Sequence, residues 1–403
     1  MIILVLNCGS SSLKYQVLDM KGDNDFTLKA KGLVERIGET VGALKHQAAS
    51  RDKYAVELPV ADHTVGIKAV LDLLVSPEQG VLSSLSEIEA VGHRVAHGGE
   101  YFSGSALIDN DVEAKIEKLC ALAPLHNPAN LLGIRAVKSL MPGIPQVAVF
   151  DTSFHQTMPD YAYTYAIPYE YYTTYGVRRY GFHGTSHKFV SKRAAEFLGL
   201  DYGNAKIITC HLGNGSSIAA VKDGRCIDTS MGFTPLEGLP MGTRCGSIDV
   251  SILPFIAEKE GLSPAGVEKM LNKKSGLLGI SGVSSDCRDI EEAAAAGNPR
   301  ASLAQNILCY QIKKIVGSYA AALGGVDAIV FTGGIGENSA PTRHDVCQGL
   351  EFLGVEIDDD VNVTIHGKDA LISKPSAKVK VAVIATNEEL VIARDTMNIV
   401  NNK

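Results

Sequence analysis

Short apolar runs alternate with longer amphipathic segments along the chain, and the N-terminus shows the pattern most simply. Residues 2–6 are apolar, residues 7–12 are rich in Gly and Ser, and residues 13–18 are again mostly apolar. Apolar runs of this length favour buried strands, and Gly and Ser favour the turn between them. The sequence therefore predicts a strand, a turn and a second strand at the start of the chain.

A similar hairpin pattern returns in mid-chain. Residues 207–211 and 218–221 are apolar runs, and residues 213–217 between them read Gly-Asn-Gly-Ser-Ser. Both hairpins place Gly-Ser-Ser after an apolar run, with a second strand close behind. Two copies of one hairpin indicate a duplication with one copy in each domain. Convergent turn chemistry is the alternative, because it would produce the same residues without a common origin.

Amphipathic segments separate further apolar runs. The periodicity predicts helices over residues 111–122, 128–140, 186–198 and 300–323, and a last helix from Asn387. The second of these has Asn127 as its N-cap and Pro128 at its first helical position. Strands are predicted over residues 146–150, 328–332 and 379–384. Strands and helices in alternation indicate the α/β class.

The length of the chain bears on the number of domains. At 403 residues it exceeds the size that one hydrophobic core usually serves, so we expect two domains. No low-complexity linker marks a boundary. We place the boundary near Asp151, where the predicted strand 146–150 ends and an aromatic-rich stretch begins.

Composition limits the classes of partner and compartment. The formal net charge of −7 argues against binding nucleic acids or membrane surfaces through bulk positive charge, so an anionic ligand would need locally placed cations. The eight cysteines are scattered without a CxxC pair, which disfavours a zinc site and a disulfide framework. The apolar start is too short for a signal peptide, and no run has the length of a membrane span. We expect a cytoplasmic globular protein.

Several turns carry residues suited to binding phosphate. Gly and Ser in the two hairpin turns let backbone N–H groups and hydroxyls approach an anion closely, and Lys14 follows the first turn. Gly-Ser turns are also common connectors, so this signal alone is weak. The P-loop pattern and the protein-kinase signatures are absent from the sequence. Gly334-Ile335-Gly336 matches half of a dinucleotide fingerprint without its acidic ribose ligand, which favours a nucleotide-binding turn over an NAD site.

Cations stand at positions that are unusual for a solvated surface. Arg94 and Arg244 each lie among glycines, which predicts that each is in a Gly-rich loop, and a guanidinium can bond a carboxylate or phosphate through two N–H groups at once. His126 directly precedes a predicted helix N-terminus, where free N–H groups favour an anion. His183 and His187 share a segment with two arginines, although a packed loop histidine and a first-turn helix histidine are the plainer interpretations.

Two acidic residues are candidates for the same chemistry. Asp151 follows a predicted strand, and ligands of open α/β sheets bind near such strand ends. Glu388 begins the last helix, but the helix dipole by itself favours Glu there.

A set of short segments carries a family resemblance. In chain order they are residues 7–14 (NCGSSSLK), 92–99 (GHRVAHGG), 123–128 (APLHNP), 150–155 (FDTSFH), 181–187 (GFHGTSH), 211–215 (HLGNG), 241–244 (MGTR), 331–338 (FTGGIGEN) and 386–389 (TNEE). Each segment is weak alone, but the ordered set is highly specific. With these segments the chain resembles the acetate kinase family.

The resemblance implies a fold and a reaction. The fold would be the α/β, actin-like (ribonuclease H-like) ATPase fold of sugar kinases and Hsp70-type ATPases, with two duplicated domains around a nucleotide cleft. Residues 1–150 and 387–403 would form an N-terminal domain closed by the last helix, and residues 151–386 a nucleotide-binding, dimer-forming C-terminal domain. The implied reaction is reversible, direct in-line phosphoryl transfer from ATP to acetate, giving acetyl phosphate and ADP, with Mg²⁺ or Mn²⁺ and in a homodimer.

The resemblance also implies residue roles. The catalytic set would be Arg94, His126, Asp151, His183 and Arg244, and the metal ligands would be Asn7 and Glu388. The acetate pocket would be formed by Arg94, Ala96, Leu125, Phe182 and Pro235. The nucleotide would be bound by Ser10, Ser12, Lys14, His211, Leu212, Gly213, Asn214, Gly215, Asp286, Cys287, Arg288, Gly334, Ile335, Gly336, Glu337 and Asn338.

The chemistry of the acceptor narrows the role of Asp151. A carboxylate is already ionised at neutral pH, so phosphoryl transfer to it needs no general base. The obstacle is repulsion between two anions, which fixed positive charge and in-line positioning overcome. We therefore expect Asp151 to orient an arginine or a metal-bound water rather than to abstract a proton.

Two alternative functions stay open on the sequence alone. The family often has Val where this chain has Ala96, and the wider pocket resembles that of propionate kinases, so a short-chain acid other than acetate is one alternative. A methylene of fit is worth only ~1–3 kcal/mol, so both acids could be used. The other alternative is an actin- or Hsp70-like nucleotide-gated binding protein, in which the Arg- and His-bearing segments would lack a purpose.

Overall fold

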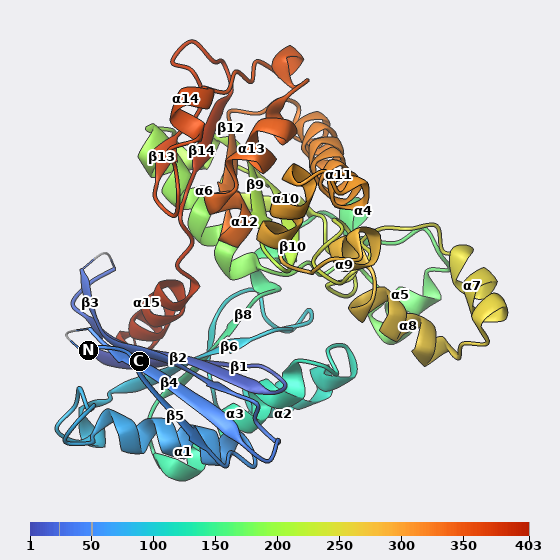
Figure 1. Ribbon diagram of the computed structural model, residues 1–403. Helices are drawn as coiled ribbons and strands as arrows, with labels where there is room; N and C mark the ends of the chain where they lie inside the picture. The colour runs from blue at the N-terminus through green and yellow to red at the C-terminus, as the bar shows by residue number, and fades with distance from the viewer. Residues whose placement is uncertain (24, 50, 403) are drawn as a thin grey trace. The chain divides into compact units, whose positions relative to one another are not determined.

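The computed structural model describes residues 1–23, 25–49 and 51–402. The chain forms two compact units: unit 1 consists of Met1–Ser153 and Asn387–Lys403, and unit 2 of Phe154–Thr386. Each unit contains a mixed β-sheet with helices packed on its faces (Figure 1). The predicted α/β class is confirmed.

Unit 1 is built on an eight-stranded sheet with the order β5-β4-β3-β2-β1-β6-β8-β7. Its strands are β1 (Ile2–Cys8), β2 (Ser12–Met20), β3 (Phe26–Glu35), β4 (Gly42–Ala48), β5 (Tyr54–Leu58), β6 (Ala90–Val95), β7 (Ala106–Leu107) and β8 (Gln146–Phe150). Its helices are α1 (His63–Leu74), α2 (Asn110–Lys118), α3 (Asn127–Leu140) and α15 (Glu388–Asn401), with short 3₁₀ turns at Leu85–Glu87 and Leu119–Ala121. β1 is antiparallel to β2 and parallel to β6, which is parallel to β8.

Alternation along β1 gives unit 1 a core on each face of its sheet. Leu4 and Leu6 point to the side of α1 and α3, and Ile3 and Val5 point to the side of α15. Helix α15 comes from the far end of the chain and is drawn in red against the blue strands of this unit (Figure 1). Its first residue, Glu388, thereby joins the residues at the carboxyl ends of the parallel strands.

Unit 2 is built on a six-stranded sheet with the order β11-β10-β9-β12-β14-β13. Its strands are β9 (Lys206–Leu212), β10 (Ser216–Lys222), β11 (Arg225–Thr229), β12 (Ala328–Thr332), β13 (Ala370–Leu371) and β14 (Lys380–Val383). Its helices are α4 (Asp160–Tyr163), α5 (Glu170–Tyr175), α6 (Gly184–Leu198), α7 (Ile252–Glu260), α8 (Pro264–Lys273), α9 (Gly276–Ser281), α10 (Cys287–Ala295), α11 (Pro299–Leu323), α12 (Gly333–Asn338), α13 (Ala340–Cys347) and α14 (Asp359–Asn362). Further 3₁₀ turns are Ser153–Thr157, Tyr202–Asn204 and Glu351–Leu353.

The two sheets repeat one topology. An antiparallel meander of three strands is followed by two parallel strands, as β3-β2-β1-β6-β8 in unit 1 and as β11-β10-β9-β12-β14 in unit 2. Side chains of α11 pack on one face of the second sheet, and side chains of α6 pack on the other. The repeated hairpin that the sequence indicated is thus the start of each sheet.

The structure corrects two local predictions in unit 1. Asn7 is not in a turn, because it pairs with Lys14 across the hairpin as part of β1, and the turn is limited to Gly9, Ser10 and Ser11. Arg94 is not in a Gly-rich loop, because Gly92 is a residue of strand β6 that lies against α15. Gly92 allows this close packing, since an added Cβ would lie 2.6 Å from Ile392 Cγ2.

One further local prediction in each unit is corrected. Helix α3 begins at Asn127 itself, with His126 in the N-cap position, because the Asn127 amide is engaged with the backbone of His97 on both of its sides. Residues 333–338 form the short helix α12 rather than a turn.

Two further features concern membrane-spanning helices and the cysteines. Over the described ranges, no helix combines the length and the apolar character that a bilayer crossing requires. All eight cysteines are free thiols.

Candidate functional site

An ion pair lies at the carboxyl ends of the parallel strands of unit 1. The guanidinium of Arg94, near the end of β6, donates from Nε (3.0 Å) and Nη2 (2.5 Å) to Oδ2 of Asp151, which follows β8. Nη1 of Arg94 donates to Oδ1 of Asn7 on β1 (3.3 Å). Asp151 is buried, and Arg94 keeps 23% of its side chain exposed. Three residues from three adjacent strands thus meet through one guanidinium.

Charge at this edge is unevenly compensated. Burial alone would lower the pKa of Arg94, but the carboxylates of Asp151 and Glu388 outweigh it and raise that pKa. Burial and then the nearby Asp151 carboxylate raise the pKa of Glu388, and the attraction of Arg94 offsets this only in part. One guanidinium therefore serves two neighbouring carboxylates, which leaves the group short of positive charge.

The donors at this edge suit a hard divalent cation. Mg²⁺ prefers oxygen ligands, keeps several waters, and is commonly bound by one or two carboxylates together with substrate phosphates. Asn7 offers an amide oxygen and Glu388 a carboxylate, and an added cation would relieve the shortage of positive charge beside Glu388. Within the described ranges, no cluster of three or more His, Cys, Asp and Glu side chains could hold a metal ion by itself.

The other predicted residues of unit 1 surround this edge. Ala96 is buried just beyond β6, and its N–H donates to Oδ1 of Asn130 (3.0 Å), whose Nδ2 in turn donates to the carbonyl of Cys8 (2.7 Å). His126 is partly buried at the N-cap of α3, and Leu125 beside it is exposed. Asn130 therefore ties the segment after Arg94 to the end of β1.

The first hairpin turn exposes its hydroxyls. Ser10 and Ser11 are exposed and Ser12 is partly so, while Lys14 projects from β2 opposite Asn7. The turn is held by its backbone: Gly9 N–H donates to the Ser12 carbonyl (2.8 Å), and Nε2 of His63 bonds the Gly9 carbonyl (2.7 Å). Its serine side chains are thus available to an anionic ligand.

Arg244 in unit 2 differs from Arg94 in its bonding partners. Nη1 of Arg244 donates to the carbonyl of Pro235 (2.8 Å), and the structure records no carboxylate within ion-pair distance of this guanidinium in the described part of the chain. Burial lowers the pKa of Arg244, with no acidic neighbour to raise it. A partly buried guanidinium without a counter-charge is suited to receive an anion.

A loop places Arg244 beside the second hairpin turn. Gly242 N–H donates to the carbonyl of Asn214 (3.1 Å), and a Cβ at Gly242 would lie 1.7 Å from the Asn214 side chain. A Cβ at Gly215 would lie 3.1 Å from Nη2 of Arg244 and 3.5 Å from Nε2 of His183. Glycine at these two positions therefore lets Arg244, His183 and the turn approach one another closely.

His183 is fixed by its backbone and by its neighbours. It occupies the N-cap of α6 with φ of 56°, a left-handed conformation that few side chains adopt. Its ring stacks on His211 at a centroid distance of 4.3 Å, and its Nδ1 bonds Oγ of Ser217 (2.9 Å). Phe182 before it packs with Met231 and Met241.

An ion-pair group supports the segment that carries Pro235. Glu237 accepts from Nη2 of Arg179 (2.7 Å) and from the Tyr165 hydroxyl (2.5 Å), which also receives the Phe233 N–H (2.9 Å). Nη1 of Arg179 donates to the carbonyl of Thr229 (2.9 Å). These bonds brace both sides of the segment whose Pro235 carbonyl holds Arg244.

A cavity of about 720 Å³ adjoins the second turn. Its walls come from that turn, from the start of α10 and from α12, and the lining residues are Gly213, Asn214, Ser285, Asp286, Cys287, Arg288, Glu291, Gly334, Ile335, Asn338 and Ser339. Hydrogen bonds from the Arg288 side chain and backbone lower the pKa of Asp286 to about 2, so this carboxylate is ionised. Mixed apolar and polar walls beside a Gly-rich turn suit a nucleotide.

Other residues predicted to bind nucleotide support this cavity without lining it. The side chain of Leu212 is in the core, and the carbonyl of Gly336 accepts from Nη1 of the buried Arg343 (3.0 Å). Glu337 accepts from the backbone N–H groups of Gly333 (2.9 Å) and Thr386 (3.1 Å). These residues fix the backbone that forms the cavity wall.

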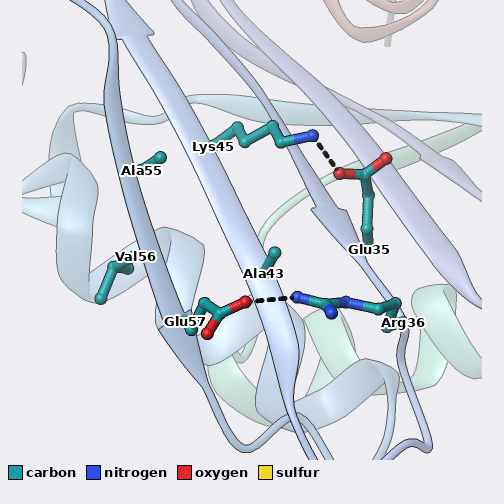
Figure 2. A pocket seen from close by; sticks show the side chains of 7 residues that line it. All are labelled: Glu35, Arg36, Ala43, Lys45, Ala55, Val56 and Glu57. Atoms are coloured by element: carbon teal, nitrogen blue, oxygen red, sulfur yellow. Dashed lines mark hydrogen bonds and ion pairs between the residues drawn. The ribbon is translucent and has the colours of Figure 1, made fainter.

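A further cavity, of about 410 Å³, lies on the outer strands of unit 1 and is separate from this chemistry. Figure 2 shows its two ion pairs, Lys45 with Glu35 (2.5 Å) and Arg36 with Glu57 (2.9 Å). Its charges are paired and largely exposed, and surface pairs of this kind contribute little energy. We assign it no ligand.

Sequence reasoning missed Ser217, Glu237 and Asn130. Ser217 was visible as part of the second Gly-Ser-Ser motif, although only its position in β10 shows that it faces His183. Glu237 and Asn130 carried no sequence signal, because their partners lie far away along the chain.

Comparison with known proteins agrees with this arrangement. The model of the Acetokinase family matches residues 2–394. An acetate kinase from Phocaeicola vulgatus is 59% identical over 401 residues, covering 100% of both chains, and one from Thermotoga maritima is 58% identical over 402 residues, covering 99% of both. The chain belongs to the acetokinase family.

Solved structures of family members have the same fold. The crystal structure of Porphyromonas gingivalis acetate kinase superposes with a TM-score of 0.95 at 53% identity and covers 99% of both chains. A propionate kinase from Francisella tularensis gives a TM-score of 0.91 at 45% identity, covering 98% of this chain and 99% of its own. The fold is therefore shared across members named for different acids.

Proposed function

We propose that this chain is an acetate kinase that transfers a phosphoryl group from ATP to acetate, giving acetyl phosphate and ADP, in a reversible reaction. Family membership sets the reaction class. The observation that carries the proposal is Arg244, a partly buried guanidinium without a carboxylate partner, next to His183 and the Gly-rich turn that borders the large cavity.

Two guanidiniums would counter the repulsion between acetate and the phosphates. Arg94 is held in place by Asp151, so its position does not depend on the ligand. Arg244 bonds a backbone carbonyl and no carboxylate within the described residues. It would bond the carboxylate of acetate or the phosphoryl group as charge shifts during transfer. Placed positive charge of this kind is the main means of catalysing phosphoryl transfer.

His183 would donate to the phosphoryl group in the transition state, and His126 would assist. The left-handed backbone and the Ser217 bond hold the His183 ring before substrate binds. Asp151 has a structural partner in Arg94, which supports a positioning role over proton abstraction. The hydroxyls of the exposed Ser10 and the partly exposed Ser12 and the ammonium of Lys14 would contact the phosphates.

Asn7 and Glu388 would hold Mg²⁺ or Mn²⁺, and the ion would supply positive charge to the phosphate oxygens. The oxygen donors and the shortage of positive charge beside Glu388 support this assignment. Chelation of divalent cations should abolish turnover, and added Mg²⁺ should restore it. A variant Glu388→Gln should require more Mg²⁺ for half-maximal rate.

One assay separates the proposed activity from its alternatives. Purified protein is incubated with ATP and Mg²⁺ and with acetate, propionate, butyrate or no acid, and ADP and acyl phosphate are both measured. We expect equal amounts of acetyl phosphate and ADP with acetate, and little ADP without acid. Hydrolysis of ATP that is independent of acid would contradict the proposal and favour a nucleotide-gated binding protein.

Propionate is the second candidate substrate. Ala96 is buried two positions beyond Arg94, where a small side chain leaves more room than the Val common in the family, and a structural match at 45% identity is named a propionate kinase. The same assay decides between the acids through the ratio of kcat/KM values.

A homodimer is the proposed assembly. Unit 2 exposes aromatic and branched apolar side chains in two segments: Tyr161, Tyr169, Tyr171 and Tyr175 in the first, and Val250, Ile252 and Phe255 in the second. Exposed apolar side chains in such numbers suit a protein interface. Light scattering of the purified chain should give twice the monomer mass of 42.8 kDa, and a monomer mass at micromolar concentration would contradict this proposal.

A further inference from the structure

The ring of His183 is the start of a chain of hydrogen bonds that leads away from the turn. Its Nδ1 bonds Oγ of Ser217 at 2.9 Å. The same oxygen bonds Nε2 of His187 at 2.7 Å, and Nδ1 of His187 bonds Oγ1 of Thr209 at 2.7 Å. The chain therefore runs from a loop histidine through a strand hydroxyl to a helix histidine and a second strand.

The inner members of this chain are fully buried. Ser217, His187 and Thr209 each have 0% exposure. Burial lowers the pKa of His187 well below its usual value, and the neighbouring His155 and His211 add to the effect. A neutral imidazole has one N–H donor and one acceptor nitrogen. His187 can therefore donate to one of the two hydroxyls, those of Ser217 and Thr209, and accept from the other.

We propose that Ser217 is a positioning residue for catalysis, which holds the Nδ1 edge of His183 so that Nε2 faces the phosphoryl group. The inference rests on the proposed phosphotransfer function. Ser217 would act through His183 and not by contact with the substrate.

The position of Nε2 supports this role. A Cβ built on Gly215 would lie 3.5 Å from both Cε1 and Nε2, so Nε2 is on the side of the ring that borders the glycine turn, while Nδ1 is the nitrogen that bonds Ser217. Arg244 borders the same turn from another side. Charged or titratable groups near the His183 ring include Arg244, which borders the same glycine, His211, which stacks on the ring, and His187, which is linked through Ser217.

The serine hydroxyl is well matched to this task. It can donate to one histidine and accept from the other, so it fixes Nδ1 of His183 in either direction of the chain. Without the hydroxyl, the ring would keep its stacking on His211 but lose the bond that fixes its rotation. Loss of orientation lowers the stability of the transition state more than that of the substrate complex.

The test compares two buried Ser→Ala variants in unit 2. Ser217→Ala removes the bond to His183, whereas the control Ser191→Ala removes a fully buried hydroxyl on α6 that bonds Tyr202 (2.9 Å) and the Lys188 carbonyl (3.2 Å). We expect Ser217→Ala to lower kcat for acetyl phosphate formation about 10- to 100-fold with both KM values near wild type. Ser191→Ala should keep kcat, and Ser217→Thr should recover most of it because the hydroxyl is retained.

Two outcomes would overturn the proposal: an unchanged kcat in Ser217→Ala, or equal losses in Ser217→Ala and Ser191→Ala. Long-range ¹H–¹⁵N NMR of the wild-type protein tests the bond directly, even if the variant does not fold. The ¹⁵N shift of His183 Nδ1 should be that of a hydrogen-bonded nitrogen, and a shift typical of an unbonded Nδ1 would reject the proposal. The NMR result does not depend on turnover, so a wild type that makes no acetyl phosphate would refute the proposed function alone.

Discussion

The two units begin with the same hairpin but place its serines differently. In unit 1, Cys8 pairs with Leu13, so Ser10 and Ser11 lie in the turn and are exposed. In unit 2, Leu212 pairs with Ser216, so Ser216 and Ser217 belong to strand β10 and are buried. A small difference in register therefore leaves the serines of one Gly-Ser-Ser motif exposed in a turn and buries those of the other in a strand.

The two arginines differ in the same way. Arg94 in unit 1 donates hydrogen bonds to Asp151 and Asn7, whereas Arg244 in unit 2 donates to the backbone carbonyl of Pro235. An ion pair fixes the position of a guanidinium and balances its charge, whereas the charge of a guanidinium bonded only to a carbonyl stays unbalanced. Unit 1 thus holds an arginine that is fixed by an ion pair, and unit 2 holds an arginine that is bonded to a backbone carbonyl.

The largest expected effect distinguishes these two arginines. Arg94→Ala leaves the buried Asp151 carboxylate without its partner, so it should lower both activity, by about 10³-fold or more, and stability, by about 3 kcal/mol. Arg244→Ala should lower activity as strongly but leave the thermal midpoint close to wild type. Steady-state kinetics and calorimetry on both variants check this.

An equal loss of stability in both variants would remove the distinction. Arg244→Lys sharpens it further, because a point charge cannot reproduce the two-pronged bonding of a guanidinium. We expect kcat to fall about 100-fold. An unchanged kcat would show that Arg244 acts only as a diffuse charge.

Buried histidines extend the comparison to pH. In unit 1, burial lowers the pKa of His93 to about 4, and its bond to Oε1 of Gln146 (2.8 Å) offsets this only in part. The unfolded chain takes up a proton on His93 near pH 6.5, whereas the folded chain takes it up only near pH 4. The contribution of neutral His93 to the free energy of unfolding is therefore complete above pH 6.5 and is lost as the pH falls to about 4. The free energy of unfolding lost over this pH range is about 3 kcal/mol.

Replacement of His93 tests this dependence. His93→Gln should flatten the loss of stability between pH 6.5 and pH 4, as measured by denaturant midpoints, whereas His366→Gln on the exposed surface should leave the slope as in wild type. An unaltered slope in His93→Gln would assign the acid sensitivity to other groups.

A smaller effect should separate the serines of the two hairpins. Ser216 Oγ accepts the Gly213 N–H (3.2 Å) and donates to the Gly213 carbonyl (2.9 Å), so Ser216→Ala should cost about 1–2 kcal/mol of stability. Ser10→Ala removes an exposed hydroxyl and should leave stability within about 0.5 kcal/mol while raising KM for ATP. Thermal melts and ATP titrations decide, and the reverse pattern would contradict the comparison.

The smallest effect concerns the choice of acid. Ala96→Val adds two methyl groups two positions from Arg94. It should lower kcat/KM for propionate relative to kcat/KM for acetate about tenfold, which is within the ~1–3 kcal/mol expected for one methylene of fit. The variant Ala129→Val, on α3, serves as a core-packing control. An unchanged ratio of the two kcat/KM values would place the acid elsewhere.

Much of the fold could be predicted from local patterns. Strands β8 and β12 match the predicted ranges, and α6, α11 and α15 differ only at their first residues, because continuous apolar runs and 3.6-residue periodicity are local signals. Strands β3, β4 and β5 were missed because they carry many polar residues on an exposed face and are defined by their partners in the sheet. Asn127 was misassigned as an N-cap because its amide bonds His97, which is distant in sequence.

The candidate site could be predicted as a set of residues but not as an arrangement. Arg94, Asp151 and Asn7 were each named from short motifs, yet only the parallel order of β1, β6 and β8 brings them into contact. Ser217 and Glu237 were not named, because a supporting hydroxyl or carboxylate is recognised only by what it bonds.

The sequence by itself determined the class of the fold, the repeated hairpin and the family, because each depends on ordered local motifs. The tertiary structure decided which arginine is paired, which serines are exposed and which histidine is held by a buried hydroxyl. These are properties of strand register and of contacts between distant segments. Hydrogen bonding, burial and local charge depend on those contacts, so the chemistry of each residue follows from its neighbours in space.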